Sequence, residues 1–187
     1  MKSALHFLRI AGTLLLITAL VAAALAGVNA ITKDRIATIN AEKVQAAIYE
    51  VLPGAEIYGQ VDLENIQDDT GMVRDIYESN KGFAVKVVVP GFGGDITMMV
   101  GVGLDGTVLG ISVVEQAETA GLGAIIADKG DKGISFRESY QGLTGPISVS
   151  KDGGQADTIT GATITSRAVA EGVNAALNAV KSMIKED

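Results

Sequence analysis

A run of hydroxyl and small residues near the C-terminus is the part of the chain best suited to chemistry. The run reads Asp157-Thr158-Ile159-Thr160-Gly161-Ala162-Thr163, and Ile164-Thr165-Ser166 follow it. Apolar residues at helical spacing come next, so a helix should begin here, with unpaired N–H groups and the positive end of its dipole. Such a helix start can hold a phosphate group. The same residue types are also ordinary helix caps, so the run alone leaves both interpretations open.

Composition restricts the chemistry that the rest of the chain can do. The 187 residues include no Cys, and the single His is His6. Disulfides, iron–sulfur ligation, thiolate zinc sites and a His-based triad are therefore excluded, and we expect no metal site. Redox chemistry would need an organic cofactor. Trp is absent and aromatic residues are few, so we expect no nucleic-acid partner.

Charge and hydropathy divide the chain near residue 33. The first 33 residues carry Lys2, Arg9 and Lys33 and no acid, whereas the remainder holds 12 basic and 22 acidic residues, a net charge of −10. No charged residue occurs from Ile10 to Thr32, a run that would be about 34 Å long as a helix and would cross a bilayer core of about 30 Å. Because Lys2 and Arg9 precede the run, we expect a cytoplasmic N-terminus and an extracytoplasmic domain in the inner or plasma membrane.

A cleaved signal peptide is the alternative to a retained anchor. Ala24-Leu25-Ala26 resembles a cleavage site, but the apolar run continues beyond it, which favours the anchor. Apolar residues at helical spacing then continue to Pro53-Gly54 and predict a membrane-proximal helix, either continuous with the span or broken near Asn29. The expected organisation is a cytoplasmic N-terminus at 1–9, a transmembrane helix at 10–32, a membrane-proximal helix at 33–54 and an extracytoplasmic domain at 55–187.

The domain is predicted to be α+β, an antiparallel sheet with packed helices. Residues 60–71 are polar and predict a loop. Four strands are expected, at 73–77, 83–89, 95–104 and 107–114, the last two joined in a hairpin at Asp105-Gly106. A short helix near 124–128, a polar stretch at 129–133, a helical turn at 136–141 and a long amphipathic helix at 165–185 complete the expected order.

One apparent nucleotide motif is rejected on its context. Gly101-Val102-Gly103-Leu104-Asp105-Gly106 matches G-x-G-x-x-G, but a dinucleotide fingerprint requires a helix after the glycines. The residues from Thr107 to Val114 read as a strand instead. We therefore expect no nicotinamide site of this type.

Three separated segments together resemble a known family. They are Gly91-Phe92-Gly93-Gly94-Asp95-Ile96, Glu118-Thr119-Ala120-Gly121-Leu122-Gly123, and the run from Asp157 to Ser166. Their order and spacing resemble the FMN-binding domain of the G subunit of the Rnf electron-transport complex. The C subunit of the sodium-translocating NADH:quinone reductase is similar but typically longer, so the shortness of this chain favours the Rnf member. The resemblance covers nearly the whole chain, although position 120 is Ala where the family usually has Pro.

The resemblance implies specific roles for these residues. Asp-x-x-Ser/Thr-Gly-Ala-Ser/Thr is the pattern at which a flavin transferase joins FMN through a phosphoester bond, which implies a covalent FMN on Thr163. The remaining motif residues would be Asp157, Thr160, Gly161 and Ala162, with Asp157 serving recognition. Glu118, Thr119, Leu122, Thr165 and Ser166 would lie near the flavin, and the N–H groups of Thr165 and Ser166 would receive the phosphate. An ordinary loop with one packed Leu is the alternative for Glu118, Thr119 and Leu122.

The implied function is that of an electron relay in an ion-translocating ferredoxin:NAD oxidoreductase, catalytically incomplete on its own. The implied partners are the other membrane subunits, the flavin transferase and membrane lipid. Three alternatives remain open: a relay like the one in the quinone reductase, a membrane-anchored flavin-binding regulatory module, and a cofactor-free anchored adaptor. Flavin that stays on the denatured chain would exclude the adaptor, and dependence of ion transport on Thr163 would exclude the regulatory module.

Overall fold

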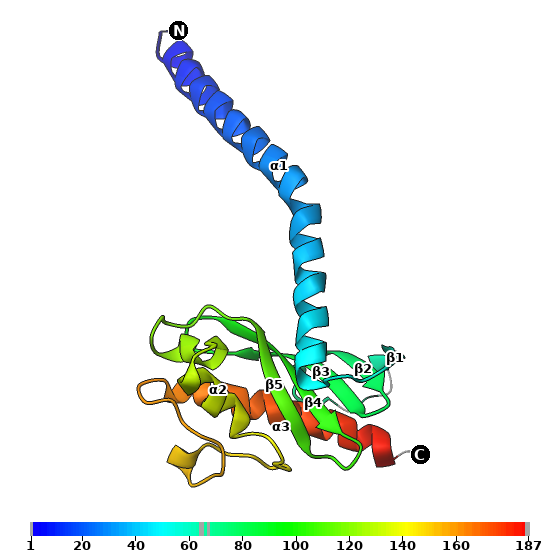
Figure 1. The fold of residues 1–187 in the computed structure, drawn as a ribbon. Helices are drawn as coiled ribbons and strands as arrows, with labels where there is room; N and C mark the ends of the chain where they lie inside the picture. Colours follow the sequence, from blue (N-terminus) through cyan, green and yellow to red (C-terminus); the bar gives the residue numbers. More distant parts are fainter. Residues whose placement is uncertain (1, 64–65, 67, 186–187) are drawn as a thin grey trace. The chain divides into compact units, whose positions relative to one another are not determined.

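The computed structural model describes residues 2–63, 66 and 68–185, so part of the predicted loop at 60–71 lies outside the described residues. It divides into two compact units, residues 1–42 and residues 43–187, which are described separately. Helix α1 (Lys2–Val51) runs through the first unit into the second without a break at Asn29, so the expected membrane-proximal helix is the second part of one continuous helix (Figure 1). Its segment from Arg9 is long and apolar enough to cross a membrane, and large apolar side chains from Ile10 to Ile31 are exposed.

The sheet is an antiparallel meander of five strands in the order β1-β2-β3-β4-β5. The strands are β1 (Ile57–Gln60), β2 (Val73–Ser79), β3 (Gly82–Pro90), β4 (Asp95–Gly103) and β5 (Val108–Glu115). The antiparallel sheet with packed helices confirms the predicted α+β class, and the four predicted strands lie within two residues of their expected ends. Strand β1 was not predicted. It has only four residues, most of them are exposed, and Gly59 interrupts the pattern.

The β4–β5 hairpin confirms the strand predicted after the G-x-G-x-x-G run. The Gly103 N–H donates to the Thr107 carbonyl over 2.8 Å, and Gly106 takes a positive φ of 78° in the turn. Strand β5 then pairs with β4 throughout the positions where a nucleotide-binding helix would be needed. Gly101 and Gly103 therefore belong to β4, and Gly106 lies in the turn between the two strands.

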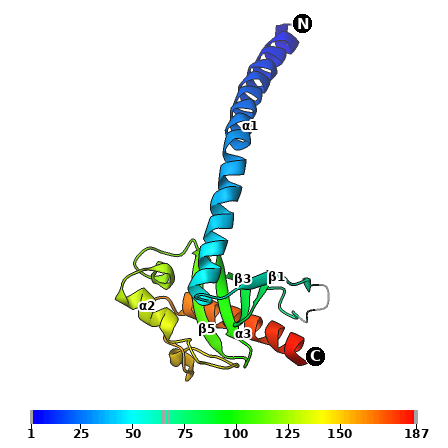
Figure 2. The same cartoon turned by 45° about the vertical axis from the view of Figure 1, so that its right-hand side comes forward.

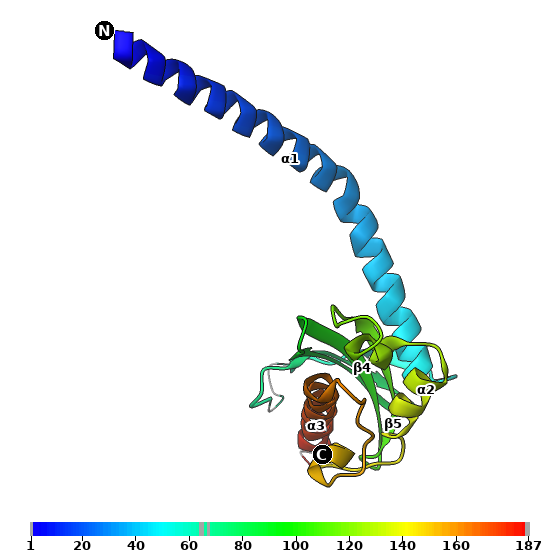
Figure 3. The same ribbon diagram turned by 90° about the vertical axis from the view of Figure 1, so that its left-hand side faces the viewer.

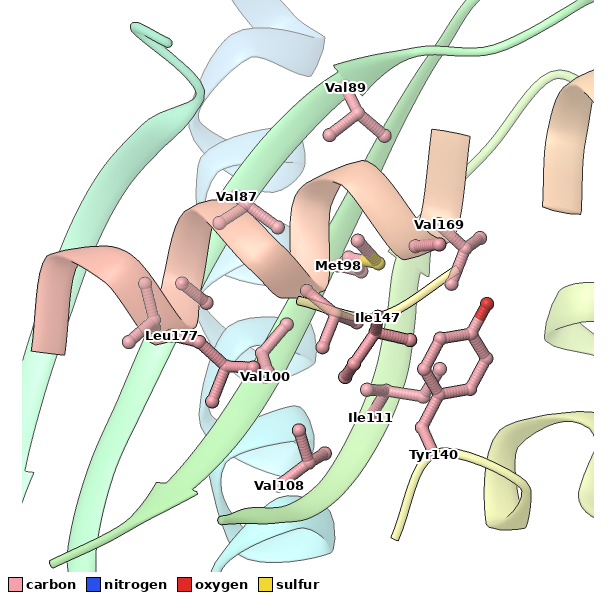
Figure 4. Packing of buried hydrophobic residues seen from close by; sticks show 14 of the residues in the cluster. Val87, Val89, Met98, Val100, Val108, Ile111, Tyr140, Ile147, Val169 and Leu177 are labelled. Carbon is pink, nitrogen blue, oxygen red and sulfur yellow. The ribbon is translucent and has the colours of Figure 1, made fainter. Parts of the chain in front are cut away.

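The main core lies between one face of the sheet and helix α3 (Thr163–Lys185). Alternate residues of β3 and β4, including Val87, Val89, Met98 and Val100, point toward α3 and meet Val169 and Leu177 (Figure 4). Figure 3 shows α3 lying along this face. Gly172 lets the helix approach closely, because a Cβ there would clash with Met98 Cε.

The opposite face of the sheet is covered near its middle by the end of α1. Ala47, Ile48, Val51 and Leu52 are buried against Ala84 and Met99, which form a second, smaller core. A row of small residues makes room for this helix end, since Ala84 pairs with Gly101 and Gly101 with Gly110. A Cβ on Gly101 would lie 2.7 Å from the Val51 carbonyl oxygen.

Three short elements connect β5 to α3. They are the 3-10 helix η2 (Gly123–Ala127), helix α2 (Asp131–Glu138) and the 3-10 turn η3 (Ser150–Asp152). Helix α2 begins five residues before the expected helical turn, inside the stretch expected to be an irregular polar segment. In Figures 1 and 2 these elements gather at the end of the sheet where α3 begins, away from β1 and the end of α3.

Candidate functional site

Thr163 is the first residue of α3, two residues earlier than the helix start expected from the sequence. The preceding turn is set by Gly161, whose φ of 82° is a conformation that favours glycine. The Ala162 N–H donates to the Ile159 carbonyl over 2.9 Å, which closes the turn directly before the helix. This turn leads into the helix, and Thr163 lies half-buried at the helix start.

The Thr163 side chain lies on a cavity of about 310 Å³, here called the Thr163 cavity. Its volume is near the lower end of the roughly 300–1,000 Å³ typical of ligand pockets, so a cofactor held there would stay partly outside. The cavity brings together seven residues assigned to the site from the sequence, namely Glu118, Thr119, Leu122, Gly161, Ala162, Thr163 and Thr165. It also includes Phe92, Gly123, Lys151 and Ile164, which the sequence reasoning did not assign to the site.

Apolar side chains form an exposed part of the cavity wall. Phe92 is 68% exposed, Ile164 53% and Leu122 43%, all high values for residues of this size. They come from three segments, the β3–β4 turn, the loop before η2 and the first turn of α3. Together they offer an apolar rim that suits the flat face of an aromatic ring.

Glu118 joins three segments beneath this rim. Its side chain is 8% exposed, one carboxylate oxygen accepts the Gly93 N–H over 2.9 Å, and the other accepts the Thr165 hydroxyl over 2.5 Å. A Cβ on Gly123 would lie 2.5 Å from the second oxygen, so that glycine is needed for the carboxylate to fit. Glu118 therefore positions the loop before β4 and the first turn of α3 relative to each other.

Lys151 brings a positive charge to the hydroxyl of Thr163. The ammonium group donates to Thr163 Oγ1 over 3.2 Å. The turn that carries it, η3, is tied to the rest of the site by Thr158, which accepts the Lys151 N–H over 3.1 Å, and by Asp152. The Asp152 carboxylate accepts two hydrogen bonds of 2.7 Å from Arg167, and these bonds hold its pKa below the ordinary value. No sequence signal singled out Lys151, because it precedes Thr163 by twelve residues in a polar Gly-containing loop.

Asp157 and Thr160 do not line the Thr163 cavity. They lie on a neighbouring cavity of about 550 Å³, here called the Asp157 cavity, together with Asp131 and Lys132 of α2. The Asp157 N–H donates to Ser139 Oγ over 3.0 Å, while its side chain is exposed. The predicted motif is therefore divided between two cavities. Thr163, the predicted attachment residue, lines the Thr163 cavity, and Asp157 lines the Asp157 cavity.

Ser166 differs most from its expected place. Its side chain is fully buried, donates to the Ala162 carbonyl and accepts the Ile159 N–H, each over 3.0 Å. Its own N–H donates to the Ala162 carbonyl, so the helix uses the donor that was expected to receive a phosphate. The Ser166 carbonyl accepts the hydroxyl of Tyr140, whose pKa is raised by burial and by the nearby Asp157 charge, so that it stays a donor.

Comparison with known proteins decides the family. Residues 91–178 match the FMN-binding domain family, a span that includes every residue of the Thr163 cavity. The chain is 31% identical to the G subunit of the Na⁺-translocating ferredoxin:NAD⁺ oxidoreductase complex of Acetobacterium woodii, over 92% of this chain and 90% of that protein. The chain belongs to the family of Rnf G subunits. Two further relatives are named as G subunits of an ion-translocating oxidoreductase complex. That of Methanosarcina acetivorans is 32% identical over 91% of this chain and 92% of the relative, and that of Cereibacter sphaeroides is 38% identical over 74% and 68%.

Membership in the family of Rnf G subunits confirms the resemblance seen in the sequence. It makes the chain an FMN-binding subunit of a membrane-bound redox complex. The Thr163 cavity fits that cofactor in chemistry, since it combines an apolar rim, a lysine and a hydroxyl at a helix start. Among the described residues, no group of three or more acidic or His side chains is placed to hold a metal ion.

Proposed function

We propose that this chain is the electron-relay subunit of an ion-translocating ferredoxin:NAD oxidoreductase and carries FMN covalently on Thr163. The observation that carries the proposal is the Thr163 hydroxyl at the start of α3, within a cavity whose rim is apolar. Among the motif's hydroxyls, Thr163 alone lies on this cavity, since Thr160 lines the Asp157 cavity. FMN supplies the capacity to accept and release electrons, which this chain lacks without it.

Attachment needs a flavin nucleotide whose phosphate is activated as a phosphoanhydride. Thr163 Oγ1 forms the new bond to that phosphorus and releases its proton to the solvent. The phosphoanhydride bond breaks, and the nucleotide fragment that carries the second phosphate leaves with the electron pair of that bond. The product is a phosphodiester with one negative charge, held beside Lys151. Gly161 and Ala162 carry little or no side-chain bulk, which leaves the hydroxyl open to the flavin transferase that performs this step.

We propose that the transferase recognises Asp157 and Thr160 from the side of the Asp157 cavity. Both side chains are exposed, and they lie away from the Thr163 cavity. A carboxylate beside a phosphate is repulsive, which supports recognition over flavin binding for Asp157. The enzyme can thus hold the motif from one side while the hydroxyl stays accessible from the other.

The relay role follows from the chemistry that the sequence lacks. The chain has no Cys, and its G-x-G-x-x-G run forms the end of β4 and the hairpin turn to β5, so neither an iron–sulfur cluster nor a nicotinamide is expected to bind. We propose that it passes electrons between partner subunits, and that other subunits take them from ferredoxin and deliver them to NAD. The proposed placement is a single span at 10–32 in contact with membrane lipid, with residues 1–9 in the cytoplasm and residues 55–187 outside.

Peptide mapping by mass spectrometry tests the attachment. The full chain produced with a flavin transferase should yield one flavin-bearing peptide, with the modification on Thr163 and none on Thr160, Thr165 or Ser166. Thr163→Ser should retain the flavin because it keeps a hydroxyl, whereas the near-isosteric Thr163→Val should lose it and keep the fold. Flavin on another residue, or on Thr163→Val, would show the proposal to be wrong.

A further inference from the structure

Lys151 is the cationic side chain among the residues that line the Thr163 cavity. The other charged residue there, Glu118, is committed to bonds with Gly93 and Thr165. Lys151 is exposed, and its ammonium group reaches into the cavity to Thr163 Oγ1 over 3.2 Å. A free lysine head at the surface gains more from full hydration than from one neutral hydroxyl. This arrangement places the charge beside the atom that is proposed to become esterified.

The turn that carries Lys151 is held in place on both sides. On one side, Thr158 accepts the Lys151 N–H, and its hydroxyl lies 3.0 Å from Ser150 Oγ. On the other side, Asp152 makes its two-bond pair with Arg167, one turn into α3. Lys151 is thus flanked by two residues that fix the backbone of η3 against the start of α3. These bonds fix the backbone of Lys151 next to the cavity, so its side chain starts from a defined position within reach of Thr163 Oγ1.

We propose that Lys151 is the positioning residue for the phosphate of the flavin on Thr163. Its ammonium group binds the incoming phosphate during attachment and afterwards pairs with the negative charge of the phosphodiester. The inference rests on the proposed attachment to Thr163 and deepens it by naming the residue that receives the charge. The carboxylate of Glu118 shares the cavity, so without Lys151 the phosphate would face that group with no cationic side chain among the lining residues.

The test measures the initial rate of FMN attachment to the full chain by a flavin transferase, with the flavin nucleotide in excess. Lys151→Met removes the charge and keeps the length, and Lys151→Arg keeps the charge. Lys129→Met is the matched control, because Lys129 is also exposed but lines a different cavity. We expect Lys151→Met to slow attachment by about tenfold or more, and Lys151→Arg and Lys129→Met to stay within about twofold of the natural chain.

Two further readouts separate a charge effect from a structural one. Raising the salt concentration should reduce the difference between the natural chain and Lys151→Met, because screening weakens the ammonium–phosphate attraction. In chains that carry the flavin, the phosphorus NMR signal of the phosphodiester should move in Lys151→Met and stay in place in Lys129→Met. Equal attachment rates for the natural chain and Lys151→Met would overturn the proposal. So would an Lys151→Arg chain as slow as Lys151→Met.

The outcome also separates this inference from the proposed function. If the natural chain takes no flavin on Thr163, the attachment itself is wrong. If the natural chain is flavinylated and Lys151→Met is flavinylated just as fast with an unchanged phosphorus signal, only the role of Lys151 is wrong.

Discussion

The Glu118 carboxylate holds two separate segments of the candidate site together. Its two oxygens each have a defined donor, from a backbone N–H on one side and from the Thr165 hydroxyl on the other. Both the loop with Gly93 and the first turn of α3 depend on this single carboxylate. A buried donor that loses its acceptor costs more than the bond itself contributes.

We predict that Glu118→Gln destabilises the full chain by about 1–3 kcal/mol. A glutamine fits the same space but offers one acceptor oxygen, so if that oxygen keeps the Gly93 N–H, its NH₂ group faces Thr165 Oγ1 and the short bond from that hydroxyl to a charged carboxylate is lost. Urea unfolding in detergent, followed by circular dichroism, measures the change. Glu115→Gln is the control, because Glu115 is exposed at the end of β5 and should unfold like the natural chain. Equal midpoints for the two variants would contradict the positioning role of Glu118.

The sequence predicted part of the residues that line the Thr163 cavity and did not predict the rest, for a physical reason. Thr163, Glu118 and Leu122 were assigned to the candidate site because they lie in recognisable short segments, and the structure brings them to one cavity. Lys151 and Phe92 were not assigned to the site, because their contribution depends on how two loops fold back onto the start of α3. Ser166 was assigned to the flavin, but the early start of α3 turns its side chain into the core.

At the scale of elements, the sheet is held between α3 and the end of α1. The main core under α3 was predictable, because β3 and β4 alternate apolar residues and α3 has a clear apolar face. The second core was harder to foresee, since it requires the small residues Ala84, Gly101 and Gly110 to lie in one row across three strands. Only strand register brings them together, and register is not visible in a single strand.

We predict that Gly101→Ala destabilises the domain by about 1–3 kcal/mol, because the new Cβ would meet the Val51 carbonyl oxygen at 2.7 Å. The backbone at the end of α1 would have to shift away from the sheet. Gly59→Ala is the matched control in β1, where an added Cβ meets nothing within 4 Å. Unfolding midpoints of the two full-length variants measure the difference. If Gly101→Ala were as stable as Gly59→Ala, the close approach of α1 to the sheet would be wrong.

At the scale of the whole molecule, the expected membrane orientation rests on one apolar segment and on the charged residues around it. The charge-free run from Ile10 to Thr32 follows Lys2 and Arg9, which favours a cytoplasmic N-terminus. An electron relay outside the cytoplasm gains from a covalent cofactor, because a tethered flavin is not lost by dilution. Electron tunnelling falls steeply with distance, so the exposed rim of the Thr163 cavity should face a partner subunit.

We predict that protease added to intact spheroplasts digests the domain from Asp34 onward. The reason is the positive charge before the span, which keeps the short N-terminal segment inside. Immunoblotting for the domain before and after digestion gives the result, and a cytoplasmic protein serves as the integrity control. Protection in spheroplasts together with digestion in inverted vesicles would reverse the orientation.

The most direct test of the relay is ion transport by the whole complex carrying Thr163→Val. The substitution replaces the hydroxyl with a methyl group of similar size, so the complex should assemble with all its subunits while lacking this flavin. In vesicles supplied with reduced ferredoxin and NAD, we predict that electron transfer and the coupled ion transport are both lost. Thr163→Ser, which keeps the hydroxyl, should restore both. Ion transport at the normal rate by an assembled Thr163→Val complex would contradict the relay role of the flavin on this chain.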